Sequence, residues 1–223
     1  VALLRGGEKT HLAQFAQREH TKHILPMVDE ILAQAGITLH QVDALVFGRG
    51  PGSFTGVRIG AGIAQGLAFG AELPVIPVSN LAAMAQAAYA QYQAENVLTA
   101  IDARMNEVYF AQWQAQKVRS DFGEFLDWQP MIAEQVCSPS NVIEQVSQQH
   151  HENAILVGTG WAAYPELKEA NLGKATEITL PSALYMLDLA LPKWFAGETI
   201  SPLEIEPIYL RNEVTWKKLP GRE

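Results

Sequence analysis

The sequence predicts a mixed α/β protein built from two lobes. A strand, a glycine-rich turn and a helix follow one another twice, and a hairpin pattern opens each half. The chain has 223 residues, 48% of them hydrophobic, which is enough for two domains of about 100 residues each. We therefore assign residues 1–96 to a first lobe and 97–223 to a second, whose tail can pack back on the first.

The first half reads as a hairpin followed by helices and strands in alternation. The chain opens with Val1 instead of Met, and residues 1–7 read as the second strand of a hairpin whose first strand is missing from the sequence. Pro26 lies within the predicted helix at 21–35, so we expect it to mark either the true first turn of that helix or a kink in it. In order we expect strands at 1–5 and 10–15, a helix at 21–35 closed by Gly36, a strand at 43–47, a helix at 55–70, a strand at 73–79, and a helix capped by Ser79 that runs to Tyr92.

The second half begins with strong strand formers on both sides of a polar turn at 103–106. A later glycine turn at 158–160 repeats the layout of the first half, although not its residues. In order we expect strands within 97–113, an irregular region at 116–140, a helix at 141–148, a strand at 154–158, a helix at 182–196 that closes the second lobe, the tail segment 206–211, and a basic end with Lys217, Lys218 and Arg222.

The stretch 48–70, GRGPGSFTGVRIGAGIAQGLAFG, carries most of the functional information. A glycine-rich turn that leads into a helix can hold a phosphate, and Ser53 or Thr55 can cap the helix. The lysine of a P-loop is absent, however, and the dinucleotide-binding glycine pattern is broken at Thr55. Gly50, Gly52 and Ser53 are the candidate phosphate contacts, and a tight connection between strand and helix is the alternative.

The helix at 55–70 is unusually rich in glycine, at a cost of about 1 kcal/mol for each glycine relative to alanine if the helix were exposed. Close packing against another backbone would offset this cost. The helix is apolar on two sides, so we expect its sheet to cover one side and a neighbouring helix or a second chain to cover the other. The candidate interface residues are Gly56, Ile59, Gly60, Ile63, Ala64 and Leu67, with Ile24, Met27 and Ile31 of the helix at 21–35.

Composition excludes several classes of protein. The net charge of −8 and the lack of a basic block argue against independent binding to nucleic acid, so a partner would supply the positive surface if nucleic acid is involved. No segment approaches the roughly 20 apolar residues of a membrane helix. The single cysteine, Cys137, rules out an internal disulfide and suits a cytoplasmic location.

Catalytic and metal-binding patterns are weak. His20 and His23 share a helix face but read as a solvated helix start, and His150 with His151 reads as a surface pair. Asp102 occupies a turn in which Arg104 is expected to pair with a nearby carboxylate. No histidine stands in a hydrolase context beside Ser53 or Ser79, so no nucleophilic triad is predicted.

Five segments together resemble the TsaB (YeaZ) family: GRGPGSFTGVRIGAGIAQGLA, LPVIPVSNL, AIDARMNEVYFA, GTGW and EPIYLR. The resemblance covers nearly all of the chain. It implies two RNase H-like lobes of the actin-like, Hsp70-like kinase (ASKHA) fold, and it implies that the missing N-terminal piece is the family's first strand with its Asp-Thr turn.

The resemblance also implies a function, namely that of a noncatalytic scaffold in the threonylcarbamoyladenosine modification of tRNA. Such a subunit binds the catalytic protein TsaD, meets the ATPase subunit TsaE through the complex, forms a homodimer when alone and contacts tRNA only indirectly. ATP or ADP and metal belong to the complex, and the subunit has no cofactor of its own. The catalytic relative carries two metal-binding histidines where this chain has Ser79, Asn80, Ala83 and Met84. The alternative is a weak ATPase or a metallopeptidase-like enzyme of the same superfamily.

Overall fold

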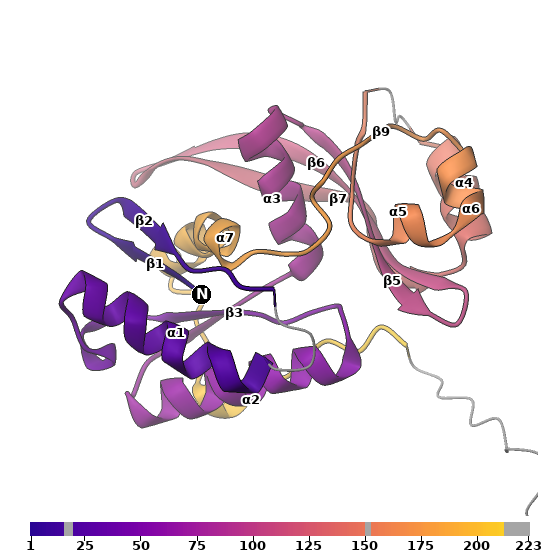
Figure 1. The fold of residues 1–223 in the computed structure, drawn as a ribbon. Helices are drawn as coiled ribbons and strands as arrows, with labels where there is room; N and C mark the ends of the chain where they lie inside the picture. Colours follow the sequence, from indigo (N-terminus) through magenta and orange to yellow (C-terminus); the bar gives the residue numbers. More distant parts are fainter. Residues whose placement is uncertain (16–19, 150–152, 212–223) are drawn as a thin grey trace, which may run out of the picture.

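The computed structural model describes residues 1–15, 20–149 and 153–211, and it shows a mixed α/β protein (Figure 1). The predicted pair His150 and His151 and the basic residues Lys217, Lys218 and Arg222 lie outside the described residues. Among the helices of the described part, none combines the length and the apolar character that a membrane crossing requires.

The first half contains two separate strand pairs and three helices. The predicted strands at 1–5 and 10–15 form an antiparallel hairpin, but the second strand runs from Glu8 to His11, and the second pair is parallel. Pro26 lies inside the first helix, and Gly36 follows that helix at a φ of +64°. The elements are β1 (Ala2–Arg5), β2 (Glu8–His11), α1 (His20–Ala35), η1 (Leu39–Gln41), β3 (Leu45–Gly48), α2 (Phe54–Gly70), β4 (Val75–Val78) and α3 (Asn80–Tyr92).

The second half is built on a five-stranded sheet with the order β7-β6-β5-β8-β9. Strand β5 lies at its centre, antiparallel to β6 and parallel to β8. The elements are β5 (Asn96–Arg104), β6 (Glu107–Ser120), β7 (Gly123–Cys137), α4 (Pro139–Ser147), β8 (Ile155–Val157), α5 (Gly160–Ala163), α6 (Pro165–Glu169), β9 (Lys174–Ala175), α7 (Ala183–Phe195) and η2 (Pro202–Glu204).

The prediction of an irregular region at 116–140 is wrong. Strand β6 continues to Ser120 and turns directly into β7, which forms the edge of the sheet. The outer part of this hairpin is largely exposed, and its register shifts between Phe110 and Trp113. An exposed edge strand with a bulge and a proline, Pro130, lacks the regular apolar alternation by which a strand is recognised.

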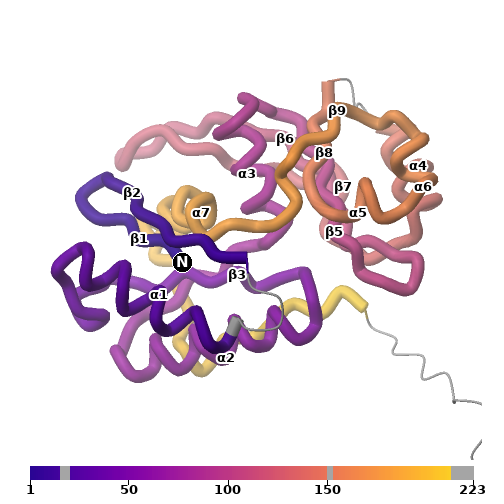
Figure 2. Tube along the Cα trace, in the orientation of Figure 1, coloured from indigo at the N-terminus to yellow at the C-terminus, as the bar shows by residue number. Residues whose placement is uncertain are grey.

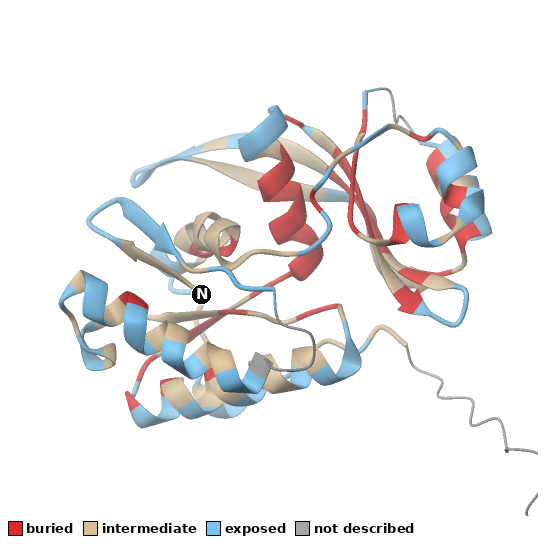
Figure 3. Ribbon diagram, in the orientation of Figure 1, coloured by how far each residue is buried: buried red, intermediate tan, exposed pale blue. Residues whose placement is uncertain are grey.

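Helices α3 and α7 each pack across the boundary between the halves. Helix α3 is almost entirely buried (Figure 3), and its Leu81 and Met84 join the core formed by Val97 and Trp113 of the five-stranded sheet. Helix α7 packs instead on β3, β4 and α3. Met186 and Ala190 of α7 pack with Ile76 and Val78 of β4, while Tyr185 and Leu189 lie against the core of the five-stranded sheet. Helix α7 therefore contacts both halves instead of only closing the second, as expected, and Figure 2 shows it beside β1 and β2.

The chain beyond α7 returns along the first half. Ile200 exchanges backbone hydrogen bonds with Val75 of β4, and η2 packs against α2. Further on, the N–H of Ile208 donates to the carbonyl of Arg49. The phenol of Tyr209 accepts a hydrogen bond from Arg58 of α2 at 2.8 Å. These contacts fix the segment to the start of α2.

A substitution at Gly158, just after β8, tests the close packing of the five-stranded sheet. It has a φ of +110°, and a Cβ there would overlap the carbonyl of Ala100 in β5, 2.7 Å from its carbon. We expect Gly158→Ala to lower the free energy of unfolding by about 2 to 4 kcal/mol, since strain and overlap add. Gly197→Ala is the control, because its φ is +71° with open space around it, and it should cost about 1 to 2 kcal/mol. Urea unfolding measures both, and equal losses would contradict the predicted overlap.

Candidate functional site

The glycine turn lies between β3 and α2 and is held by the chain's own groups. The N–H of Asn80 donates to the carbonyl of Gly50 at 2.9 Å, and its side-chain amide donates to the carbonyl of Pro51 at 3.1 Å. A Cβ at either Gly50 or Gly52 would lie 3.3 Å from a methyl of Val57, so the glycines allow the first turn of α2 to approach. This packing agrees with the alternative interpretation of the turn, a tight connection between strand and helix.

Ser53 caps α2, as predicted, since its hydroxyl accepts from the N–H of Gly56. Two of the three candidate phosphate residues, Gly50 and Gly52, are thus engaged in packing with Val57, while Ser53 is exposed. Phosphate contact at Gly50, Gly52 and Ser53 stays a prediction.

The nine candidate interface residues fall into two groups. Six of them line an apolar cavity between the helices and the sheet, and three do not. Ala64 is 5% exposed and belongs to the core beneath α2. The cavity group is Ile24, Ile31, Gly60, Ile63, Ala64 and Leu67, and the other three are Met27, Gly56 and Ile59.

The outward face of α2 is formed partly by residues that the sequence reasoning missed. Gly62 and Gly66 are exposed, and no atom lies within 4 Å of where a Cβ would be at either position. Phe69, one turn further along, is 64% exposed. Spacings of four and three residues place these three on one face of the helix, and that spacing was available in the sequence.

A polar cluster joins both halves at the ends of β3 and β4. Arg49 pairs with Glu134 of β7 at 2.7 Å, and the hydroxyl of Ser79 donates to the same carboxylate. Lys193 of α7 donates to the carbonyl of Pro77 at 3.1 Å. Burial lowers the pKa of Lys193, and the positive charge of Arg49 lowers it further. The cluster holds β7 and α7 against the parallel pair.

The turn after β5 forms a second polar cluster. Asp102 pairs with Arg104 at 3.0 Å, which confirms the expected ion pair, and Tyr164 donates to Asp102 at 2.8 Å. Burial and then the hydrogen bond to Asp102 raise the pKa of Tyr164. Arg211 pairs with Glu107 and also donates to the carbonyl of Ala103 at 3.1 Å. The turn and the tail segment therefore hold each other in place.

Metal ligands are not clustered in the described part of the chain, where no group of three or more His, Cys, Asp or Glu side chains converges. The side chains from Ser79 to Met84 are buried in the core instead. Ala83 and Met84 are fully buried, and Ser79 caps α3 by accepting from the N–H of Ala82 at 3.1 Å.

Comparison with known proteins first defines the class. The family model "TsaD: tRNA N6-adenosine threonylcarbamoyltransferase" matches residues 12–193, so the chain has the fold of this group of tRNA-modification proteins. A solved structure described as an uncharacterized protein with similarity to peptidase YEAZ, from Pseudomonas aeruginosa, superposes with a TM-score of 0.82 at 38% identity, covering 94% of this chain and 93% of that one.

Two relatives then define the family. The tRNA threonylcarbamoyladenosine biosynthesis protein TsaB of Haemophilus influenzae is 68% identical over the whole chain and 93% of its own length. The protein of the same name from Escherichia coli is 49% identical over the whole chain and 94% of its own length. The chain belongs to the TsaB family, which confirms the resemblance and ties the chain to threonylcarbamoyladenosine biosynthesis.

The alkylation rate of Cys137 tests whether the chain offers a reactive cysteine thiolate. Burial raises the pKa of its thiol to about 11, and the nearby charge of Glu107 contributes in the same direction. Since the thiolate is the reactive form, alkylation by iodoacetamide at pH 8 should be about a hundredfold slower in the folded chain than in urea. The control is Ser120→Cys, an exposed position, which should react at similar rates in both states. Equal rates for Cys137 would contradict its burial.

Proposed function

We propose that this chain is a noncatalytic scaffold subunit that binds the catalytic protein TsaD and thereby supports threonylcarbamoyl transfer to tRNA. The observation that carries the proposal is the outward face of α2 in a chain of the TsaB family. This face combines bare backbone at Gly62 and Gly66 with the exposed ring of Phe69. The ATPase subunit TsaE would join through the complex, and tRNA would be contacted only indirectly.

The energetics of α2 support a partner on this face. Each exposed glycine costs a helix about 1 kcal/mol relative to alanine, and nothing within the described part of this chain packs on Gly62 or Gly66. A facing helix could approach the bare backbone closely and bury Phe69 at the same time. A self-complementary contact through the same face would give the homodimer that we propose for the chain alone.

The segment Ser79 to Met84 supports the noncatalytic assignment. Its side chains serve to cap α3 and to fill the core, and none is an imidazole. We infer that ATP or ADP and metal act in the complex and not on this chain alone. The pathway implies a cytoplasmic location. We also propose that the two halves, 1–96 and 97–223, are the RNase H-like lobes of the actin-like fold.

The alternative is a weak ATPase or a metallopeptidase-like enzyme, and the Pseudomonas aeruginosa structure is described as similar to a peptidase. Reconstitution separates the two proposals. With TsaD and the remaining subunits from the same organism, threonylcarbamoyladenosine formation in tRNA should require this chain. The chain alone should produce none. Formation by TsaD without this chain, or steady ATP or peptide hydrolysis by this chain alone, would contradict the scaffold proposal.

Gly66→Leu tests the outward face of α2. A large side chain should overfill a tight contact at a cost of about 1 to 3 kcal/mol, which lowers the affinity for TsaD by roughly one to two powers of ten. Glu144→Leu adds the same side chain at an exposed position of α4 and should leave the affinity unchanged. Calorimetry measures binding after circular dichroism shows a folded variant. A folded Gly66→Leu chain that binds TsaD with unchanged affinity would place the interface elsewhere.

A further inference from the structure

A cluster of exposed aromatic and cationic side chains lies at the start of α2. The guanidinium of Arg58 stacks on Phe54, 3.6 Å from the centre of the ring, and its Nε donates to the phenol of Tyr209 at 2.8 Å. The centroids of the two rings lie 6.2 Å apart. Phe54 is 58% exposed and Tyr209 49% exposed, so α2 and the tail segment present these side chains to solvent together.

The stacked arrangement leaves the terminal nitrogens of Arg58 available for a ligand. Among the described residues, the bond from Nε is the only hydrogen bond of its side chain, and no carboxylate pairs with it. A guanidinium presents its N–H groups in a fixed fork that matches a carboxylate. Because Phe54 and Tyr209 already hold the side chain, little rotamer freedom is lost on binding. Arg58 is therefore preorganised for an acidic group.

The tail segment continues from this cluster to the turn between β5 and β6 (Figure 1). There Arg211 donates to the carbonyl of Ala103 at 3.1 Å and pairs with Glu107. The side chain of Arg104 is 86% exposed, and Met105 is 71% exposed. The start of α2 and this turn thus form one surface that spans both halves of the chain. We call it the arginine surface, and its members are Phe54, Arg58, Arg104, Met105, Tyr209 and Arg211.

The turn between β5 and β6 has an unusual backbone. Arg104, Met105 and Asn106 all have a positive φ, at +63°, +57° and +59°. Left-handed backbone is costly for residues other than glycine and persists where the surroundings fix it. Here the N–H of Arg104 donates to the carboxylate of Asp102 at 2.8 Å. Such backbone is concentrated at functional sites, and in this turn it holds the apolar side chain of Met105 in solvent.

The composition of the arginine surface is typical of a protein interface. Arg, Met and aromatic residues are enriched in interfaces relative to the rest of a protein surface, whereas Lys and Glu are depleted. Arg104 and Arg211 share their charge with Asp102 and Glu107, so three arginines and two carboxylates leave one excess positive charge, that of Arg58. The surface therefore suits a partner that brings a carboxylate together with apolar side chains.

A nucleic acid fits this surface less well than a protein does. Binding to nucleic acid draws its strength from many phosphate contacts made by Lys and Arg. The arginine surface has one arginine without a described carboxylate partner and no lysine, in a chain of net charge −8. It can neutralise few phosphates.

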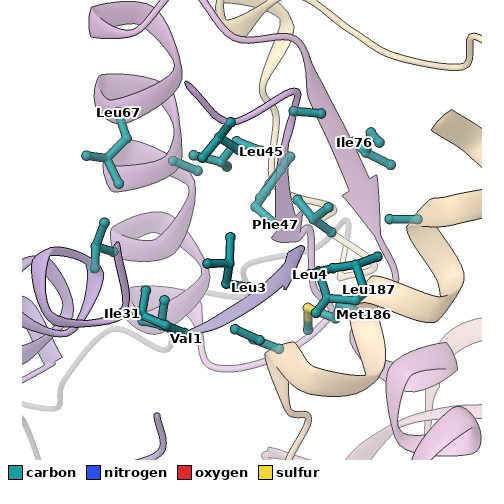
Figure 4. Close-up of a pocket in the computed structure, with 18 of the residues that line it drawn as sticks. Val1, Leu3, Leu4, Ile31, Leu45, Phe47, Leu67, Ile76, Met186 and Leu187 are labelled. Carbon is teal, nitrogen blue, oxygen red and sulfur yellow. The ribbon is translucent and has the colours of Figure 1, made fainter. Parts of the chain in front are cut away.

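The arginine surface adjoins the outward face of α2. Arg58 lies one turn before Gly62, on the same side of the helix. Two of the apolar candidates for an interface are directed elsewhere, since Ile31 and Leu67 line the apolar cavity beside β3 (Figure 4). A partner that packs on Gly62 therefore reaches the arginine surface by extending its contact toward the start of α2.

We propose that the arginine surface binds an acidic segment of a partner protein, which thereby contacts both halves of this chain. In the complex proposed above this partner is TsaD, and in this respect the inference rests on the proposed function. A carboxylate of TsaD pairs with Arg58, and apolar side chains beside it cover Phe54 and Met105. Because attraction between opposite charges acts before contact, the arginine surface raises the association rate above all.

Association kinetics with TsaD test the proposal. The double variant Arg58→Glu with Arg104→Glu should associate about tenfold more slowly than the unaltered chain at about 0.05 M salt, and about twofold more slowly at about 0.5 M, where salt screens the charges. The control, Lys117→Glu with Arg119→Glu, changes the net charge equally at exposed positions near the other end of β6. It should leave the rate within about twofold. Surface plasmon resonance measures the rates after circular dichroism shows folded variants.

The outcomes separate this inference from the scaffold proposal. If TsaD binds the double variant as fast as the unaltered chain at low salt, the inference is wrong and the scaffold proposal stands. Equal slowing by the control also overturns the inference, because net charge alone then sets the rate. If the unaltered chain does not bind TsaD at either salt concentration, both fail. Slower binding of tRNA to the assembled complex, with TsaD binding unchanged, assigns the surface to nucleic acid instead. If the double variant does not fold, Arg58→Glu alone decides, with an expected slowing of about threefold.

Discussion

The close approach of α2 to the β3–β4 pair is the contact on which the rest of the first half depends. Ala61, Ala64 and Ala68 are the buried positions of α2, and together they let the helix lie directly over Phe47 and Val75. The same helix carries glycines on its outward face, so a partner could approach it as closely as its own sheet does. One helix with small residues on both sides thus links the internal packing to the proposed interface.

The two halves are held together by two helices that each pack on the other half and by an ion pair between the halves. Helix α3 fills the core of the five-stranded sheet, while α7 covers the parallel pair of the first half. The ion pair of Arg49 and Glu134 adds a polar link, and Glu134 also accepts from Ser79. Ser79 thus links the cap of α3 to this ion pair, while Ala83 and Met84 fill the core.

The longer helices and the strands β3 and β4 could be predicted from the sequence because their signals are local. Ser53 and Ser79 cap helices, and Gly36 follows one. The long β6–β7 hairpin could not be predicted. Its exposed outer part has no buried face, so apolar and polar residues do not alternate along it as they do in a half-buried strand. The interface set was drawn from two helices without their tertiary partners. Side chains such as Ile63 and Leu67 satisfy the same apolar pattern whether they face a cavity or a second protein.

The central claim is that the outward face of α2 contacts TsaD directly. Site-specific crosslinking tests it most directly, with a photoreactive group attached to Gly66→Cys, while the buried thiol of Cys137 stays unlabelled. The account predicts a covalent adduct with TsaD from this position and none from the same group at Glu124→Cys, an exposed position on β7. An adduct from Glu124→Cys together with none from Gly66→Cys, both in folded chains, would contradict the account.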